Sequence, residues 1–207
     1  MEDHKKTGTT TVALKCSDGV ILASDKRATM GNFISDKEAQ KVYQIDDKIA
    51  MTIAGGVGDA QTIVRLLRAE TKLFKMNRKK PITIKAAATL LSNVLNGNRY
   101  YPYIVMSIIA GIDKEPRVFS IDPVGGLMEE DFMSTGSGSP IAYGVLEYEF
   151  KKNKTVKENL PIAVRAVKIA QERDSASGNG VSLATITNDG FKMFDEAEVK
   201  KILNSLN

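Results

Sequence analysis

The sequence contains very few of the residues on which many hydrolases and metalloproteins depend. Its 207 residues include one histidine, one cysteine and no tryptophan, and the histidine, His4, lies in a short polar leader, MEDHKKTG. This scarcity disfavours Ser-His and Cys-His catalysis and any zinc site that needs imidazole or several thiolate ligands. Any hydrolytic chemistry must then take its base from a lysine, a carboxylate or a terminal amine, and we expect no metal and no cofactor.

Other shortages narrow the class of protein further. A single cysteine, Cys16, excludes an intrachain disulfide and fits a reducing compartment. No apolar run has the length of a membrane span, and the leader lacks the hydrophobic stretch of a signal peptide. Lysine and arginine exceed the acidic residues by only 29 to 25 and are scattered along the chain. We therefore expect a cytoplasmic protein that binds neither membranes nor nucleic acid.

The hydrophobic pattern predicts one α+β domain. A content of 43% hydrophobic and 26% charged residues is ordinary for a globular chain of this length. Two successive helices after a run of strands favour a helical layer on a sheet over βαβ winding. We predict a four-layer α-β-β-α sandwich, with two antiparallel sheets between helix pairs. The predicted strands are residues 9–16, 20–25, 41–45, 48–54, 103–112, 117–121, 131–135, 181–187 and 191–194. Five helices are predicted, beginning near residues 58, 83, 140, 155 and 195.

Two glycine-containing loops each have more than one interpretation. Gly55-Gly56-Val57-Gly58 lies between a strand and a helix but lacks the spacing of G-x-G-x-x-G and of the P-loop, which disfavours a nucleotide-binding module. It is either a simple turn or a place where glycine exposes a backbone N–H, as an oxyanion hole requires. The second loop, STGSGSP, either supplies a serine that caps the helix containing Pro140 or belongs to a site.

The tetrapeptide Gly8-Thr9-Thr10-Thr11 also has two interpretations. Threonine is β-branched, so three in a row are typical of a strand, in which Thr9 and Thr11 would share one face and Thr10 the other. Alternatively, removal of residues 1–8 would leave Thr9 with a free α-amine beside its own hydroxyl. One residue would then carry both the nucleophile and its base.

Several motifs together resemble the archaeal-type proteasome β subunit, a family of N-terminal nucleophile hydrolases, along almost the whole chain. The resemblance is carried by GTTT, IAGGVGDAQ, LLSNVLN, FSIDPVGG, STGSGSPIAYGVLE and RDSASG. STGSGSP and RDSASG behind a Gly-Thr junction are a specific combination, far more so than any single motif. The layered architecture of that family is the one predicted from the order of strands and helices.

The resemblance implies a role for each matching residue. Thr9 corresponds to the N-terminal nucleophile and Gly55 to the donor of the oxyanion-hole N–H, while Thr29 and Gly55 correspond to the backbone positions that bind substrate as an added strand. Arg27 fits a supporting role. Asp25 and Lys41 correspond to the acid and the lysine beside the nucleophile, and Ser137, Asp174 and Ser177 correspond to the residues that hold its amine. The first specificity pocket would be lined by small or apolar residues: Ala28, Ala39, Ile53 and Val57.

The resemblance also implies a function and partners. Residues 1–8 would be a propeptide removed by autocatalytic cleavage at Gly8-Thr9, and residues 9–207 a single catalytic domain. The mature chain would be a threonine endopeptidase that degrades unfolded proteins to peptides. Its partners would be other β subunits in a heptameric ring, rings of α subunits and an unfoldase ATPase. The alternative is a catalytically silent ring subunit of the same fold.

Elementary chemistry agrees with these roles. While Gly8 is attached, the Thr9 nitrogen is an amide and cannot serve as a base. A positive charge on Lys41 would lower the pKa of the amine and of the hydroxyl, and Asp25 would help to keep Lys41 charged.

Overall fold

The first sheet is built around two hydrophobic strands near the start of the chain. In the computed structural model, which describes residues 8–204, β1 and β2 pair antiparallel with Thr11 opposite Ser24. Every residue of β2 is buried, so this strand lies at the centre of the sandwich. The strand order is β10-β1-β2-β11-β12. The strands are β1 (Thr11–Lys15), β2 (Gly19–Asp25), β10 (Phe132–Thr135), β11 (Val181–Thr187) and β12 (Gly190–Met193).

The second sheet is also antiparallel and follows the chain order β5-β6-β7-β8-β9. Its central strands are nearly as well buried as β2, as expected for a sheet covered on both faces. The strands are β5 (Val42–Asp46), β6 (Ile49–Gly55), β7 (Val105–Ile112), β8 (Pro116–Ile121) and β9 (Leu127–Glu129).

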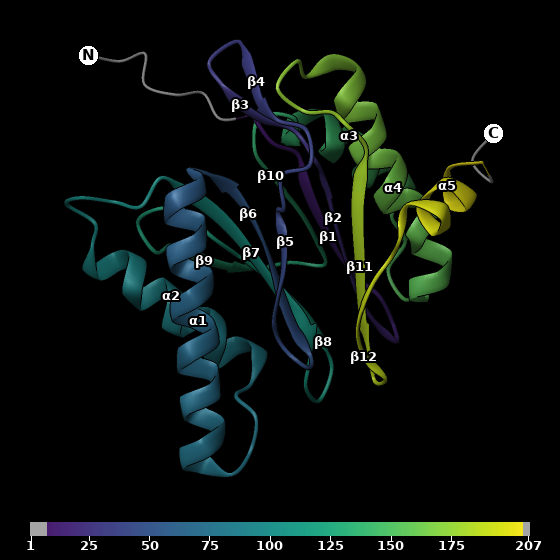
Figure 1. Cartoon of the computed structure of the whole chain (residues 1–207). Coiled ribbons are helices and arrows are strands. Elements are labelled where there is room, and N and C mark those ends of the chain that lie inside the picture. The colour runs from purple at the N-terminus through teal and green to yellow at the C-terminus, as the bar shows by residue number, and fades with distance from the viewer. Residues whose placement is uncertain (1–7, 205–207) are drawn as a thin grey trace.

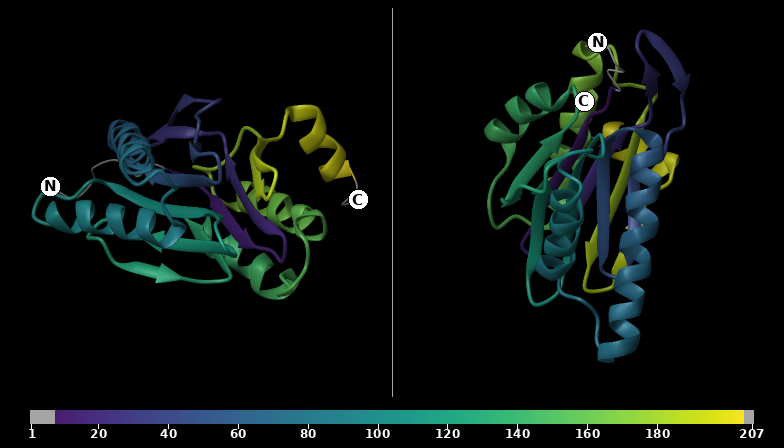
Figure 2. Two further views of the ribbon diagram at one scale, coloured as in Figure 1. Left: turned by 90° about the horizontal axis from the view of Figure 1, so that it is seen from below. Right: turned by 90° about the vertical axis from the view of Figure 1, so that its left-hand side faces the viewer.

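Helices cover the outer face of each sheet. Figure 1 shows α1 and α2 against the second sheet, and α3, α4 and α5 beside the first. The view from below in Figure 2 keeps the two helix groups on opposite sides of the strands. The helices are α1 (Val57–Arg78), α2 (Ile84–Gly97), α3 (Ser139–Glu149), α4 (Val156–Arg173) and α5 (Glu196–Asn204).

Three hydrophobic clusters correspond to the three interfaces between these layers. Alternation along β1 shows how one strand serves two of them, because Val12 and Leu14 pack toward the helices while Ala13 packs toward the other sheet. A third cluster, with Phe119 and Leu91, lies between the second sheet and its helices. The predicted four-layer α+β sandwich is therefore confirmed.

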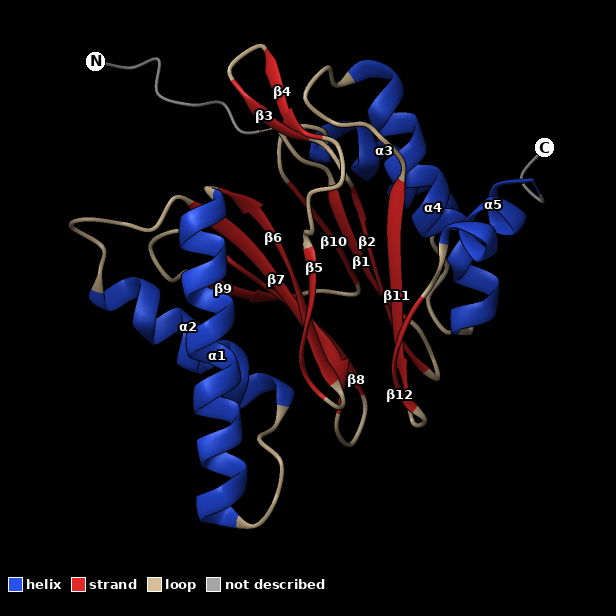
Figure 3. Ribbon diagram, in the orientation of Figure 1, coloured by secondary structure: helices blue, strands red, loops and turns tan. Residues whose placement is uncertain are grey.

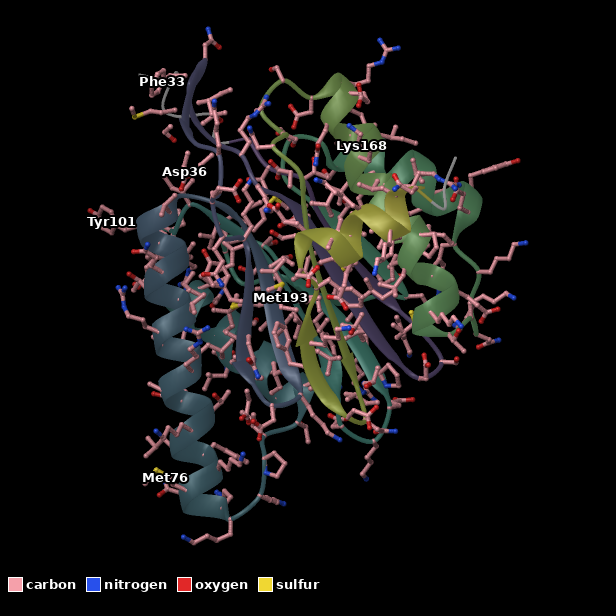
Figure 4. All side chains as sticks on the ribbon, turned by 45° about the vertical axis from the view of Figure 1, so that its right-hand side comes forward. Phe33, Asp36, Met76, Tyr101, Lys168 and Met193 are labelled. Atoms are coloured by element: carbon pink, nitrogen blue, oxygen red, sulfur yellow. The ribbon has the colours of Figure 1, made fainter. Side chains whose placement is uncertain are left out.

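A short hairpin on the surface was not predicted. β3 (Ala28–Met30) and β4 (Phe33–Asp36) pair with each other at the end of the sandwich where β2 ends (Figure 3). All four residues of β4 are exposed, so the strand has no alternation of apolar and polar residues to reveal it. Phe33 projects away from the body of the molecule (Figure 4). β9, a three-residue edge strand, was missed for a similar reason.

None of the helices within residues 8–204 combines the length and apolar composition needed to cross a membrane. Residues 1–7, most of the predicted propeptide and the whole setting of His4, lie outside the described part of the chain.

Candidate active site

Thr9 lies buried at the point where the chain enters the first sheet. Its side-chain hydroxyl donates a hydrogen bond to the carbonyl oxygen of Gly8 over 2.6 Å. Its backbone N–H donates to Ser137 Oγ over 3.2 Å, and its carbonyl oxygen accepts from the Gly138 N–H over 3.2 Å. Thr9 is only 3% exposed, so its hydroxyl and nitrogen are shielded from bulk water in the uncut chain.

The first strand begins two residues later than the sequence predicted. The hydrophobic pattern places its start at Thr9, but the observed β1 starts at Thr11. The N–H groups of Thr9 and Thr10 donate to Ser137 and to Asp25 Oδ1 instead of a neighbouring strand. The backbone N–H groups of both threonines are therefore hydrogen-bonded to side chains of the site.

Asp25 and Lys41 form a buried ion pair beside Thr9. Lys41 Nζ lies 2.6 Å from Asp25 Oδ1 and also donates to the Gly8 carbonyl oxygen over 3.4 Å. Asp25 is fully buried as the last residue of β2, and Lys41 directly precedes β5 and is 6% exposed. The remaining acceptor sites on Asp25 are filled by backbone N–H groups of Thr10, Arg27 and Gly178 at 2.9–3.0 Å. A buried carboxylate with this many donors is well compensated for its loss of water.

Burial and Asp25 act on the pKa of Lys41 in opposite directions. Desolvation is the larger cause and lowers the pKa below its ordinary value, because the charged ammonium is taken out of water. The charge of Asp25 and its hydrogen bond raise the pKa but do not fully offset the burial. Lys41 thus gives up its proton more readily than an exposed lysine would, which the sequence did not reveal.

Ser137, Asp174 and Ser177 form a second group on the other side of the Thr9 nitrogen. Both serine hydroxyls donate to Asp174 Oδ2 over 2.6 Å. Asp174 is the C-cap residue directly after α4, and Ser137 lies in the loop before α3. Ser137 is not a helix cap, because the N-cap of α3 is Gly138 and no side chain caps that helix.

A pocket beside Thr9 brings together the residues that the resemblance assigned to substrate. Its walls come from the hairpin β3–β4, from the segment before β5, and from the junction of β6 with α1. Gly55, at that junction, has a φ of 136°, a region that favours glycine. The residues that line the pocket are Gly8, Thr9, Ala28, Thr29, Ser35, Ala39, Gln40, Lys41, Tyr43, Ile53, Gly55, Val57 and Ala60.

Gly8 fits tightly at the mouth of the site. A Cβ atom at this position would lie 1.7 Å from Ala176 Cβ, so no larger residue fits without moving the loop after α4. The Gly8 N–H donates to Thr29 Oγ1 over 2.9 Å. Gly8 is therefore held on both sides at the bond where cleavage was predicted.

Every predicted site residue lies either in the pocket or in one of the two hydrogen-bonded groups. Other residues were missed. Thr10 contacts both groups, and the Gly178 N–H binds Asp25, but a backbone donor leaves no trace in a sequence. Arg27, assigned a supporting role, donates to Asn179 Oδ1 and to the Ser175 carbonyl oxygen, and so joins the loop after α4 to the end of β2.

The arrangement places a hydroxyl, a lysine–carboxylate pair and a hydrogen-bonded backbone nitrogen around one peptide bond. Attack by the hydroxyl needs a group that accepts its proton and a donor for the developing oxyanion. Lys41 lies within 3.4 Å of the carbonyl oxygen of Gly8, and Ser137 is positioned against the nitrogen. The site can therefore support acyl transfer to Thr9.

Comparison with known proteins gives a single family. The family model described as "Proteasome subunit" matches residues 5–186. The proteasome subunit beta of Methanocaldococcus fervens is 57% identical over 202 residues, covering 96% of this chain and 90% of the relative. The proteasome subunit beta of Methanosarcina barkeri is 55% identical over 206 residues, covering 99% of this chain and 98% of the relative. The proteasome subunit beta of Methanococcus maripaludis is 53% identical over 211 residues, covering 100% of this chain and 96% of the relative. With a four-layer sandwich and relatives that match over nearly their full length, the chain belongs to the proteasome subunit family, as an archaeal-type β subunit.

Proposed function

We propose that this chain is a threonine endopeptidase of the proteasome core that matures by cutting its own Gly8-Thr9 bond. The observation that carries the proposal is the position of the Thr9 hydroxyl, 2.6 Å from the carbonyl oxygen of Gly8 and inside a buried site with Lys41 and Asp25. A structural subunit of the same fold has no physical need for a buried ion pair and a hydroxyl network around one peptide bond. Residues 1–8 are then the propeptide, and residues 9–207 the catalytic domain.

Maturation is an acyl transfer from nitrogen to oxygen. Thr9 Oγ attacks the carbonyl carbon of Gly8, a C–O bond forms, and the C–N bond to Thr9 breaks. The proton lost from Thr9 Oγ is transferred to the Thr9 nitrogen, which leaves as a free amine, and water then hydrolyses the ester to release residues 1–8 as a carboxylic acid. In this step the Lys41 ammonium donates to the oxygen of Gly8, where negative charge develops, and its lowered pKa makes it a stronger proton donor than an ordinary lysine.

Peptide hydrolysis uses the same hydroxyl with the new amine as its base. An α-amine has an ordinary pKa of roughly 7.7–8.0, so a useful fraction is neutral near physiological pH. The amine sits against Ser137, whose hydroxyl is held by Asp174. The Gly55 N–H is assigned to the oxyanion of the substrate, a contribution of about 3 kcal/mol for a typical donor of this kind. The backbone of Thr29 and Gly55 holds the substrate as an added strand.

Intact mass spectrometry of the purified chain tests the proposal directly. Loss of residues 1–8, with Thr9 at the new terminus and hydrolysis of unfolded protein, is the expected result. A chain that assembles but keeps its leader and cuts no peptide would instead be the silent ring subunit. The proposal also places the chain in heptameric β rings beside α-subunit rings, fed by an unfoldase ATPase, which native mass spectrometry of the particle formed with α subunits would check.

The pocket predicts cleavage after apolar residues. Its side walls come from Ala28, Ala39, Ile53 and Val57, which offer no charge to pair with an arginine or glutamate of the substrate. Peptides that differ only in the residue before the cut should be cleaved after leucine or tyrosine at least about tenfold faster, as kcat/KM, than after arginine or glutamate. Ala39→Glu, which adds a carboxylate to the wall, should raise the relative rate after arginine. Faster cleavage after arginine by the unaltered chain would contradict this assignment.

A further inference from the structure

Thr10 joins the two hydrogen-bonded groups of the site. Its N–H donates to Asp25 Oδ1 over 2.9 Å, and Asp25 also binds Lys41. Its hydroxyl lies 2.7 Å from Ser177 Oγ, and Ser177 in turn binds Asp174. Thr10 is fully buried, so water cannot replace either contact. One residue therefore links the lysine–carboxylate pair to the group that faces the Thr9 nitrogen.

The direction of the bond between Thr10 and Ser177 follows from counting protons. Ser177 has one hydroxyl proton, and it donates that proton to Asp174 Oδ2 over 2.6 Å. The contact with Thr10 must then be a bond that Thr10 donates and Ser177 accepts. Ser137 donates to the same Asp174 oxygen and accepts from the Thr9 nitrogen. The chain of bonds thus starts at the Thr10 hydroxyl and reaches Thr9 through Asp174.

The loop before α3 leaves room for this hydroxyl. A Cβ atom at Gly138 would lie 2.0 Å from Thr10 Oγ1 and 3.2 Å from Asp174 Oδ2. The backbone of Gly138 is in the ordinary right-handed helical region, with φ −85° and ψ −1°, so its conformation is open to any residue. Glycine is required at this position because the Thr10 hydroxyl occupies the space that a side chain would need.

We propose that Thr10 is a positioning residue for catalysis by Thr9. Its hydroxyl fixes the position of Ser177, which donates to Asp174. Asp174 accepts the hydroxyl proton of Ser137 and so orients the Ser137 oxygen toward the nitrogen of Thr9. The proposal rests on the function proposed above, in which that nitrogen becomes the catalytic base. A hydroxyl that accepts a hydrogen bond donates more strongly, so loss of the Thr10 donor weakens the bond from Ser177 to Asp174 and leaves the carboxylate that orients Ser137 less firmly held. Thr10 is absent from the described lining of the pocket, so its hydroxyl should affect turnover rather than substrate binding.

Thr10→Val removes the hydroxyl and keeps the β-branched shape and the N–H to Asp25. We expect kcat for a single peptide to fall about tenfold to a hundredfold, because a catalytic group that is slightly misplaced loses much of its effect, while KM stays near the wild-type value. The matched control is Thr11→Val. Thr11 is also fully buried, one residue further along, but its hydroxyl pairs with Thr135 Oγ1 over 2.6 Å, away from both groups. Thr11→Val should keep the wild-type kcat.

A serine variant distinguishes the contribution of the Thr10 hydroxyl to catalysis from an effect of the substitution on folding. Thr10→Ser keeps the donor and should retain most of the wild-type kcat, whereas Thr10→Ala should behave like Thr10→Val. If Thr10→Val fails to assemble, the serine and alanine variants give the same comparison. If a variant stays uncut, chains produced with Thr9 as their first residue supply the kinetics. A kcat for the valine or alanine variant equal to that of Thr11→Val, or a rise in KM alone, would overturn the proposal.

The outcome also distinguishes this proposal from the proposed function. A wild-type chain that is neither processed nor active would refute the endopeptidase itself. A processed and active wild type beside a fully active Thr10→Val would refute only the role of Thr10.

Discussion

Thr9→Ala is expected to remain uncut and to hydrolyse no peptide. The substitution removes the hydroxyl that lies 2.6 Å from the Gly8 carbonyl oxygen and leaves the rest of the buried site in place. Without a nucleophile neither the Gly8-Thr9 bond nor a substrate can form the ester, and loss of a nucleophile lowers the rate of such enzymes by about a millionfold. Intact mass gives the state of the leader, and a fluorogenic peptide gives the activity of the same preparation.

Two controls separate the role of Thr9 from damage to the strand. Thr9→Ser retains a hydroxyl and can acquire a terminal amine, so it should be processed and keep measurable activity. Its slower rate would reflect the missing methyl group, which restricts rotation about χ1 in threonine. Thr11→Val should be processed and active. A Thr9→Ala chain that loses residues 1–8 in the absence of other proteases, or that cuts peptides, would refute the assignment of the nucleophile.

Lys41→Met is expected to abolish nearly all activity while the particle still assembles. Proton transfer by a positioned side chain typically contributes about a hundredfold to ten-thousandfold, and Lys41 also donates to the oxygen of the bond to be cut. Processing and kcat should fall by at least the lower of these factors. The measurement is single-turnover cleavage of a peptide by particles whose size has been checked by chromatography.

Loss of Lys41 also leaves Asp25 buried without its cation, and removal of one partner of a buried ion pair costs about 3–5 kcal/mol in stability. The double variant Asp25→Asn with Lys41→Met removes both charges, so it should recover much of the melting temperature but none of the activity. Lys26→Met is the matched single control, because Lys26 pairs with Glu38 and Glu196 at the surface. Near-normal hydrolysis by assembled Lys41→Met would contradict the role given to Lys41.

Much of the fold follows from local patterns in the sequence. Alternation in β1 separates Ala13 from Val12 and Leu14, and the helical spacing of Ile63, Val64 and Leu67 marks the buried face of α1. These patterns exist because each element is buried on a defined face. In the hairpin of β3 and β4, β4 is fully exposed and Thr29 is the buried residue of β3, so no alternating pattern marks the hairpin, although Ala28, Thr29 and Ser35 help to form the pocket.

The candidate site was found mainly through motifs, and its finer properties depend on distances that no motif contains. Asp25, Lys41 and Asp174 could be predicted as site residues from the sequence, because their types and spacing match those of a known family. The sequence could not show that burial outweighs Asp25 in setting the pKa of Lys41, since that balance depends on the packing of the two sheets. Nor could it show that Thr10, which is typical of any strand, bonds to both groups.

The carboxylate of Asp25 has a consequence for the dynamics of the site. It accepts from the backbone of Thr10 before β1, of Arg27 after β2 and of Gly178 in the loop after α4, three segments far apart in the sequence. Each segment has its own bond to this one carboxylate, so a movement of the Asp25 side chain loosens all three, and we expect them to open as one cooperative unit. Slow amide exchange at these positions would then rise and fall together, and the rigidity of the site would depend on a single side chain.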